Sequence, residues 1–171
     1  AALLKYVGWG PIKGAFRGSD GKFSKGFEEI GKRLEALLTK EEYQTASKST
    51  QYAHYTAEHV VRSMWRAVEG MGFKGGSVFE PGMGIGHFLG MMPADIAENS
   101  SYQGIEMDRM TTDIAKLLYP QSGVRLADLT ATPIPENTFD LVIGNPPFAD
   151  TIIQSDPKYA ARGFSLHNYF F

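Results

Sequence analysis

A rigid polar tip follows residues 140–144, a short apolar stretch with the character of a buried strand. The tip consists of Asn145, Pro146, Pro147 and Phe148. Prolines cannot continue a central strand because they lack the N–H group of the ladder, and the residue before a proline is held extended. The side-chain oxygen of Asn145 and the carbonyl oxygen of Pro146 are therefore expected to be hydrogen-bond acceptors with fixed directions.

A glycine-rich turn follows an earlier predicted strand at residues 77–80. Its glycines are Gly82, Gly84 and Gly86. They permit a tight turn and the close approach of a ligand to backbone N–H groups at a helix start. Glu80, just before the turn, would repel a pyrophosphate but favour a cationic ligand with an ammonium and a sulfonium group. The alternative is that Glu80 is only a surface residue at a strand end.

Two further carboxylates close later strands. Glu106 ends the predicted strand 102–106, where it could accept both hydroxyl groups of a ribose. Asp128 follows the strand 124–126 and could accept an adenine amino group, although a single Asp there is more often a turn residue. Asp108 is interpreted as a helix N-cap rather than a ligand contact.

The elements that must position these residues are strands alternating with helices. Helices are predicted at residues 87–91 and from the Asp108 cap to Pro120. This alternation predicts right-handed βαβ units and a parallel sheet, in which ligands bind outside the carboxyl ends of the strands. His87 is interpreted as a helix-start residue, and Met83 and Ile85 of the turn are expected to point away from the ligand.

The first part of the chain is organised differently. Residues 8–26 are loop-like and contain six glycines. Helices are predicted over residues 27–38, from a capping box at 39–42, and from Thr56 as cap to Gly70. The apolar face of the first helix consists of Ile30, Leu34, Leu37 and Leu38. The chain is therefore divided into an N-terminal extension, residues 1–50, and an α/β domain, residues 51–171.

Composition excludes several classes of protein. A chain of 171 residues can form a hydrophobic core without disulfides or structural metal ions. The lack of cysteine excludes disulfides, thiolate nucleophiles and Cys-based zinc sites. No metal site is predicted. No apolar run approaches the ~20 residues of a membrane span, and no signal-peptide pattern is present. A cytoplasmic protein without a membrane partner is expected.

Charge is unevenly distributed along the chain. Residues 1–50 contain nine Lys or Arg and six Asp or Glu, a net +3, whereas residues 51–171 contain eight and thirteen, a net −5. This asymmetry favours contact of the N-terminal part with a polyanion, although a merely solvated surface is the simpler alternative. The candidate phosphate contacts are Lys5, Lys13, Arg17, Lys22, Lys25 and Lys32, with Trp9 and Phe16 as packing anchors. The other role considered for residues 1–48 is a structural brace against the sheet.

The glycine turn and the polar tip together resemble a known family. The segment Glu-Pro-x-x-Gly-x-Gly-x-Phe at 80–88, followed by Asn-Pro-Pro-Phe at 145–148, is similar to amino-methyltransferases that use S-adenosylmethionine. Residues 49–61 resemble the Tyr-Thr motif of type I-like adenine methylases. Residues 3–16 and 37–56 resemble adenine-specific DNA methylases of phages and mobile elements, often fused to a Swi/Snf-type helicase. The resemblance covers nearly the whole chain.

The resemblance implies a Rossmann-like class I methyltransferase fold and methyl transfer to the exocyclic N6 amino group of adenine in DNA. S-adenosylmethionine is the implied cofactor, and DNA and a helicase region of the same protein are the implied partners. The implied cofactor-binding residues are Tyr55, Thr56, Glu80, Gly82, Gly84 and Gly86 for the methionine part, Glu106 for the ribose and Asp128 for the adenine. The implied catalytic residues are Asn145, Pro146, Pro147 and Phe148.

The polar tip suits this chemistry. The lone pair of an exocyclic amine is delocalised into the ring, so the amine is a poor nucleophile. Two acceptors, the Asn145 side chain and the Pro146 carbonyl, would favour a pyramidal nitrogen with an available lone pair. Phe148 offers a flat face on which a base taken out of the helix can stack.

Other functions share the tip motif. Asn-Pro-Pro-Phe also occurs in enzymes that methylate guanine in ribosomal RNA, and a close variant occurs in those that methylate a protein glutamine. A third alternative is a non-catalytic cofactor- or DNA-binding module of a larger helicase protein. Relatives have seven strands, whereas four are predicted here by Gly144. The domain is therefore expected to be incomplete, with weak or absent activity alone and self-association through the 140–144 edge.

Overall fold

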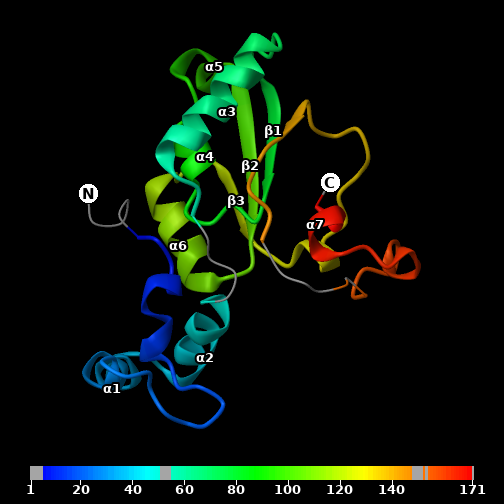
Figure 1. Cartoon of the computed structure of the whole chain (residues 1–171). Helices are drawn as coiled ribbons and strands as arrows, with labels where there is room; N and C mark the ends of the chain where they lie inside the picture. Colours follow the sequence, from blue (N-terminus) through cyan, green and yellow to red (C-terminus); the bar gives the residue numbers. More distant parts are fainter. Residues whose placement is uncertain (1–5, 51–54, 148–151, 153, 171) are drawn as a thin grey trace. The chain divides into compact units, whose positions relative to one another are not determined.

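The computed structural model describes residues 6–50, 55–147, 152 and 154–170 of the chain. These residues form two compact units, one within Lys5–His54 and one within Tyr55–Phe171. Figure 1 labels the helices and strands of both units. The domain boundary predicted after residue 50 adjoins residues 51–54, which lie outside the described residues.

The N-terminal unit is helical in its described residues. Its elements are the 3-10 helix η2 (Gly10–Ala15) and the α-helices α1 (Glu28–Leu37) and α2 (Lys40–Ser49). The predicted capping box before α2 is confirmed: Thr39 Oγ1 accepts from the Glu42 N–H at 3.2 Å, and the Thr39 N–H donates to Glu42 Oε2 at 2.8 Å. Two N–H groups that would otherwise lack partners are thereby satisfied. The helix η2 lies within the stretch predicted as loop.

Helix α1 packs closely at Gly31, and its predicted apolar face is only partly covered: Leu34 and Leu38 are half-buried. A Cβ atom on Gly31 would lie 2.5 Å from the Phe23 ring and 2.9 Å from the Ala15 carbonyl oxygen, so a side chain there would force its neighbours apart. On the apolar face, Leu37 is 74% exposed and Ile30 is 44% exposed. The predicted helix is confirmed, but its close contacts are made along the Gly31 side.

The C-terminal unit is built on a parallel sheet. Its strands are β1 (Gly76–Pro81), β2 (Ser100–Glu106), β3 (Gly123–Leu126) and β4 (Leu141–Val142). Their order is β3-β2-β1-β4, and every neighbouring pair is parallel. The predicted α/β fold with a parallel sheet is confirmed. The carboxyl ends of these strands meet at one edge, where open α/β sheets bind ligands.

Strand β4 is shorter than the predicted strand 140–144, but its backbone hydrogen bonds extend beyond it. The Asp140 N–H donates to the Ser77 carbonyl at 2.9 Å, and the Ile143 N–H donates to the Phe79 carbonyl at 3.0 Å. The Asp140 carboxylate also accepts from the Ser77 N–H at 2.8 Å, which ties the start of β4 to the start of β1. The chain leaves the sheet after Ile143, because the prolines that follow cannot pair.

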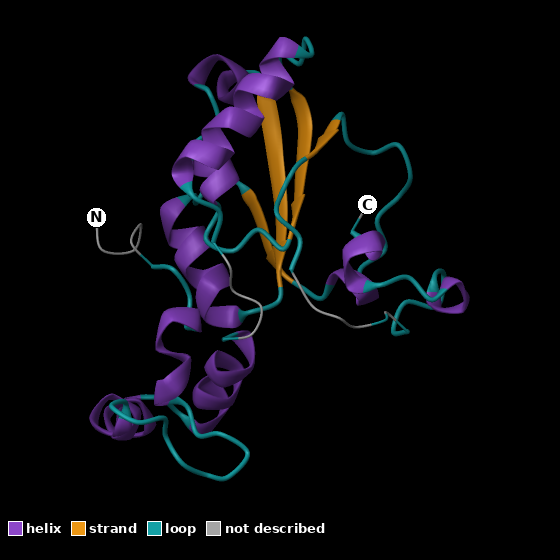
Figure 2. Ribbon diagram, in the orientation of Figure 1, coloured by secondary structure: helices purple, strands orange, loops and turns teal. Residues whose placement is uncertain are grey.

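Helices lie on both sides of the sheet. They are α3 (Glu58–Gly70), α4 (His87–Gly90), α5 (Ala94–Glu98), α6 (Arg109–Leu118) and α7 (Leu166–Tyr169), with 3-10 helices η3 (Leu129–Ala131) and η4 (Ala160–Arg162). Figures 1 and 2 show α3, α4 and α6 on one side of the sheet and α7 on the other. Trp65 of α3 donates its indole N–H to the Phe88 carbonyl at 2.9 Å, which joins α3 to α4 inside the core. None of the described helices has the length and apolar character that a bilayer crossing needs.

Two predicted helix starts have opposite outcomes. Asp108 caps α6 as predicted, since its Oδ2 accepts from the Thr111 N–H at 2.8 Å. The prediction that Thr56 caps α3 is wrong, because Ala57 occupies the N-cap position without a side-chain hydrogen bond. The Ala57 carbonyl accepts from the Val60 N–H at 2.9 Å, so the helix begins one residue later than predicted.

Candidate functional site

The glycine turn adopts a conformation that side chains resist. Gly82, Gly84 and Gly86 have φ angles of 67°, 57° and 83°, in the left-handed region that favours glycine. Gly86 is the N-cap of α4, which begins at His87 as predicted. A Cβ atom on Gly82 would lie 3.8 Å from the Pro147 ring, so the turn and the polar tip are neighbours in the fold. Gly82 and Pro147, 65 positions apart in sequence, therefore bring two predicted site regions together at this edge of the sheet.

Tyr55 also lies on the glycine turn. A Cβ atom on Gly84 would lie 3.2 Å from the Tyr55 ring, and the Tyr55 and His87 rings meet edge-on with centroids 5.1 Å apart. Thr56 is half-buried directly after Tyr55. The upstream motif of the sequence analysis is thus brought to the turn, although Tyr55 alone makes a described contact with it.

Glu80 is a buried carboxylate at the end of β1. Its exposed fraction is 2%, and its neighbours on β2 and in the chain after β4 include glycines. Gly104 is its partner in the β1–β2 register, and a Cβ atom on Gly144 would lie 3.4 Å from Glu80 Cγ. The Tyr102 hydroxyl donates a hydrogen bond to Glu80 Oε2. The interpretation of Glu80 as a surface residue is therefore wrong, because β2 and the chain after β4 enclose it.

The electrostatic surroundings of Glu80 oppose its charged form. Burial is the largest cause that raises the pKa of Glu80 well above its usual value, and the nearby Glu106 adds to the rise. The hydrogen bond from Tyr102 acts in the opposite direction. The ion pairs of the described residues, Arg17–Glu35, Arg62–Glu58 and Lys158–Glu136, all lie elsewhere. A buried carboxylate without a basic partner among the described residues is a candidate for binding a cationic ligand.

Glu106 ties the glycine turn to the end of β2. Its Oε2 accepts from the Gly84 N–H at 3.0 Å, and its Oε1 accepts from the Asp108 N–H at 2.8 Å. Burial raises the pKa of Glu106, and these backbone hydrogen bonds offset part of the rise. Each carboxylate oxygen has a second lone pair, so the group can still accept from a ligand hydroxyl.

Asp128 differs from the carboxylates of this buried cluster in its exposure to solvent. The residue is exposed, and its Oδ1 accepts from the N–H and the hydroxyl of Thr130, both at 2.8 Å. These hydrogen bonds make Asp128 the N-cap of η3. Asp128 thus has the turn role that a single Asp after a strand more often takes, and a ligand contact by Asp128 stays a prediction.

The polar tip begins beside Glu80. Asn145, Pro146 and Pro147 are half-buried and follow the last β4 hydrogen bond at Ile143. Because Gly144 lies against Glu80, the backbone delivers Asn145 to the edge that holds the carboxylate and the glycine turn. Phe148 lies outside the described residues, so its predicted stacking role stays a prediction.

Two tyrosines in this region were not predicted. Tyr102 contacts Glu80, and the Tyr119 ring, just after α6, would lie 2.8 Å from a Cβ atom on Gly86. The period of two along β2 places Tyr102 on the same face as Glu106, which is a signal that sequence reasoning could have used. The pairing of Tyr102 with Glu80 also depends on the strand register, which the sequence does not reveal.

The fold and this strand edge define a class I methyltransferase-like α/β protein. The sequence model of the family N-6 DNA Methylase matches residues 27–169. The chain belongs to this family of N-6 DNA methylases.

Two known proteins show how this chain relates to larger ones. It is 27% identical over 111 residues to "Defense against restriction protein B" of Escherichia phage P1, covering 63% of this chain and 5% of the phage protein. Its fold is similar to a solved type I restriction-modification methyltransferase subunit from Streptococcus thermophilus, with a TM-score of 0.52 and 20% identity. That similarity covers 82% of this chain and 39% of the subunit, and it confirms the predicted fold class.

Proposed function

We propose that this protein transfers a methyl group from S-adenosylmethionine to the exocyclic N6 amino group of adenine in DNA. The observation that carries the proposal is the meeting of the polar tip, the glycine turn and the buried Glu80 at one edge of the sheet, in a chain of the N-6 DNA methylase family. Acceptors for an amine and a pocket for a cationic ligand are the two requirements of this reaction.

The residues at this edge fit S-adenosylmethionine. When bound, this cofactor supplies a methyl group activated by a sulfonium. Glu80 is buried without a described basic partner, so it would hold the cationic methionine end. The turn of Gly82, Gly84 and Gly86 leaves its backbone open to close approach. Tyr55 and Thr56 would lie against the methionine part, Glu106 would accept the ribose hydroxyls, and Asp128 would accept the adenine amino group.

The chain's own contribution to the chemical step is orientation. The Asn145 side-chain oxygen and the Pro146 carbonyl would accept the two N–H groups of the target amine, and Pro147 lies beside Gly82. Acceptors that are fixed before the substrate arrives need no reorganisation during the reaction. Phe148 would stack on the target base after it leaves the duplex.

The proposal extends to partners and organisation. Residues 51–171 would form the methyltransferase domain, and residues 1–50 an extension that contacts DNA. A helicase region of a longer protein and self-association through β4 belong to the same proposal, as does a cytoplasmic location. Val142 of β4 is 56% exposed, which supports an accessible strand edge.

Methyl transfer from radiolabelled S-adenosylmethionine to DNA, ribosomal RNA and protein, followed by nucleoside and amino-acid analysis, tests the function. N6-methyladenine in DNA is expected. Methylguanine in RNA or methylglutamine in protein would replace the proposed substrate, and cofactor binding without transfer would support the non-catalytic module.

Substitution of the polar tip tests its role in the reaction. Asn145→Ala is expected to lower the rate by about 10² or more, about 2.7 kcal/mol, while cofactor affinity stays unchanged. Asn99→Ala is the matched control, because Asn99 is exposed and lies before β2, at the opposite end of that strand. Near-normal turnover by Asn145→Ala would show that another group orients the amine.

A further inference from the structure

The strand register gives Glu80 a specific neighbour. Val78 of β1 pairs with Tyr102 of β2, and Glu80 pairs with Gly104. Side chains two residues apart on a strand share a face, so Tyr102 and Glu80 point to the same side of the sheet. Because Gly104 has no side chain, nothing from its own position separates the Tyr102 ring from the carboxylate. The hydroxyl of Tyr102, which is 7% exposed, donates to Glu80 Oε2.

The other described groups that interact with Glu80 carry no positive charge. From β2, Glu106 adds a second carboxylate, and from the end of α6, Tyr119 interacts electrostatically with Glu80. From the chain after β4, the contact is the backbone at Gly144. Among these described neighbours, the Tyr102 hydroxyl is the group that favours the ionised carboxylate. A hydrogen bond to a charged acceptor is roughly twice as strong as one between neutral groups.

We propose that Tyr102 is a positioning residue for the cofactor, which holds the Glu80 carboxylate ready for the cationic methionine end, and that cofactor binding expels a proton from Glu80. The inference rests on the proposed function, and it adds a residue and a linkage that the function does not require. The step is an exchange of ions: the protonated carboxyl releases its proton to solvent and the carboxylate takes the cation. No covalent bond other than the O–H bond is broken.

The proposal has a thermodynamic consequence that can be measured. Below the pKa of Glu80 in the free protein, each bound cofactor must displace one proton. Affinity then rises by about tenfold per pH unit and levels off above that pKa. The Tyr102 hydrogen bond lowers the pKa of Glu80, so its loss moves the whole profile to higher pH.

Calorimetric titration with S-adenosylmethionine at several pH values, in buffers of different ionisation enthalpy, tests the linkage. The unmodified protein is expected to release up to one proton and to bind more tightly as pH rises. Glu80→Gln is expected to bind weakly, with no proton release and a flat pH profile. Binding by the unmodified protein with neither proton release nor pH dependence would overturn the inference while leaving the proposed function intact.

Tyr102→Phe tests the positioning role. The variant is expected to bind about tenfold more weakly at neutral pH and to recover at high pH, since the carboxylate then ionises without help. Tyr119→Phe is the matched control: it removes a hydroxyl from the same region but no described hydrogen bond to Glu80, so the profile should keep its position. An equal loss of affinity by Tyr102→Phe at every pH would indicate a merely structural role and overturn the proposal. Absence of cofactor binding by the unmodified protein at all pH values would instead refute the proposed function, and the inference would fall with it.

Discussion

Two glutamates, one in each unit, have carboxyl pKa values that their surroundings shift in opposite directions. Glu80 is buried beside a tyrosine and a second carboxylate, and burial raises its pKa. Glu35 lies on the surface of the N-terminal unit and accepts two hydrogen bonds from Arg17, at 2.6 and 2.9 Å, which lower its pKa. Glu35 has a positively charged partner, Arg17, whereas Glu80 has no such partner among the described residues. The unmatched group is the candidate for ligand binding, because folding alone gives no reason to bury it.

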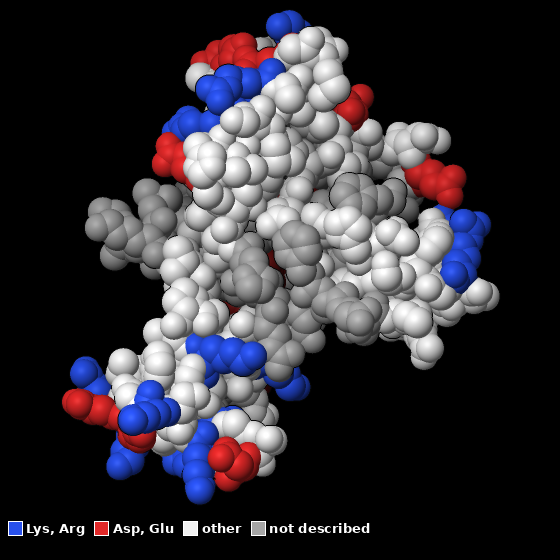
Figure 3. Space-filling model, viewed as in Figure 1, with Lys and Arg blue, Asp and Glu red and all other residues white. Residues whose placement is uncertain are grey.

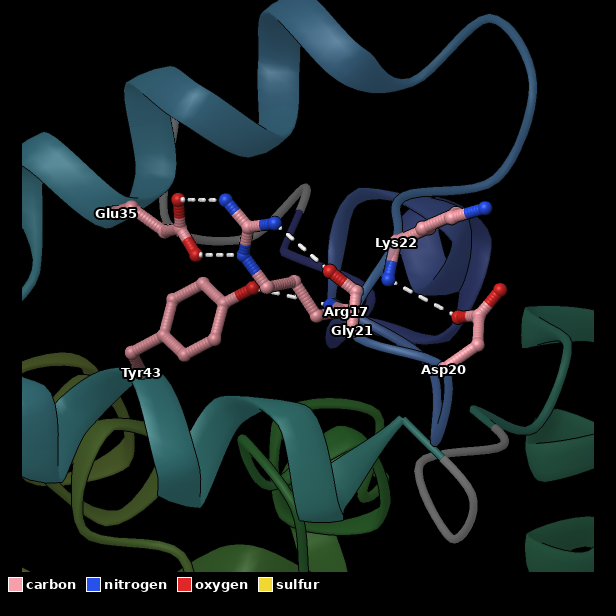
Figure 4. A network of polar contacts seen from close by, with 6 residues as sticks. All are labelled: Arg17, Asp20, Gly21, Lys22, Glu35 and Tyr43. Atoms are coloured by element: carbon pink, nitrogen blue, oxygen red, sulfur yellow. Dashed lines mark hydrogen bonds and ion pairs between the residues drawn. The ribbon is translucent and has the colours of Figure 1, made fainter.

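Arg17 shows what a matched charge does for the fold. Besides Glu35, its guanidinium donates to the Gly21 carbonyl at 2.8 Å and lies 4.2 Å from the centre of the Phe23 ring. Figure 4 shows Arg17 at the centre of this network, with the Tyr43 hydroxyl accepting from its backbone N–H. The network connects the loop around Gly21 to α1 and α2. Arg17, predicted as a phosphate contact, is thus engaged in holding its own unit together.

The largest expected effect comes from the turn beside Glu80. Gly84→Asp would add a charge and a Cβ 3.2 Å from the Tyr55 ring at a φ of 57°, so cofactor binding should be abolished. Gly163→Asp is the matched control, because Gly163 has a φ of 59° and open space around it. Calorimetry with S-adenosylmethionine measures both variants. Unchanged affinity in Gly84→Asp would remove the turn from the cofactor site.

Stability measurements sharpen the comparison at Glu80. A carboxyl whose pKa is raised on folding contributes stability that is present below its ordinary pKa and lost as pH rises through the raised value. Glu80→Gln is therefore expected to raise the free energy of unfolding of the cofactor-free protein at neutral pH, by on the order of 1–3 kcal/mol. Denaturant unfolding at pH 5 and pH 8 measures the effect. A variant that is less stable than the unmodified protein at pH 8 would contradict the assignment of Glu80 as an uncompensated charge.

The parts of this site that depend on local chemistry were predictable from the sequence. Glycines at 82, 84 and 86 demand a left-handed turn, the prolines after Asn145 end a strand, and Asp108 caps a helix with its own side chain. The Tyr102–Glu80 contact was not predictable, because it depends on which residues two strands place opposite each other. The packing of α1 was missed for a similar reason, since a partner ring, Phe23, fits only over Gly31.

A smaller effect is expected from the lysines of the N-terminal unit. Basic side chains, with acidic ones between them, are prominent over this unit in Figure 3. Lys13 and Lys22 line a hollow of about 390 Å³ that also contains hydroxyl side chains, whereas Lys25 and Lys32 do not line it. All four lysines are exposed, so the two pairs are matched in charge and accessibility.

Salt titrations of DNA binding distinguish a phosphate site from diffuse charge. If DNA phosphates bind in the hollow, the double variant Lys13→Ala with Lys22→Ala should weaken DNA binding. The slope of log binding constant against log salt concentration should become shallower by about two, at ~0.9 per contact. The pair Lys25→Ala with Lys32→Ala should leave the slope nearly unchanged. Equal changes in both pairs would indicate a merely charged surface. A chain that begins near Lys48 and keeps the full slope would exclude any phosphate contact by the N-terminal unit; the predicted contact of Lys5 lies outside the described residues.

The smallest effect is expected at the matched carboxylate, and its sign is opposite to that at Glu80. The pKa of Glu35 is lowered by Arg17, so its contribution to stability is present above the ordinary carboxyl pKa and is lost as pH falls through the lowered value. Glu35→Gln should therefore slightly reduce stability at neutral pH and have no effect at low pH, because exposed ion pairs contribute little and are screened by salt. Hydrogen exchange of the amides in α1 and the 17–22 loop, at low and high salt, reports the local change. Increased protection of these amides in Glu35→Gln at neutral pH would contradict this expectation. It would show that the ionised Glu35 carboxylate destabilises its unit, as the ionised Glu80 carboxylate is expected to do.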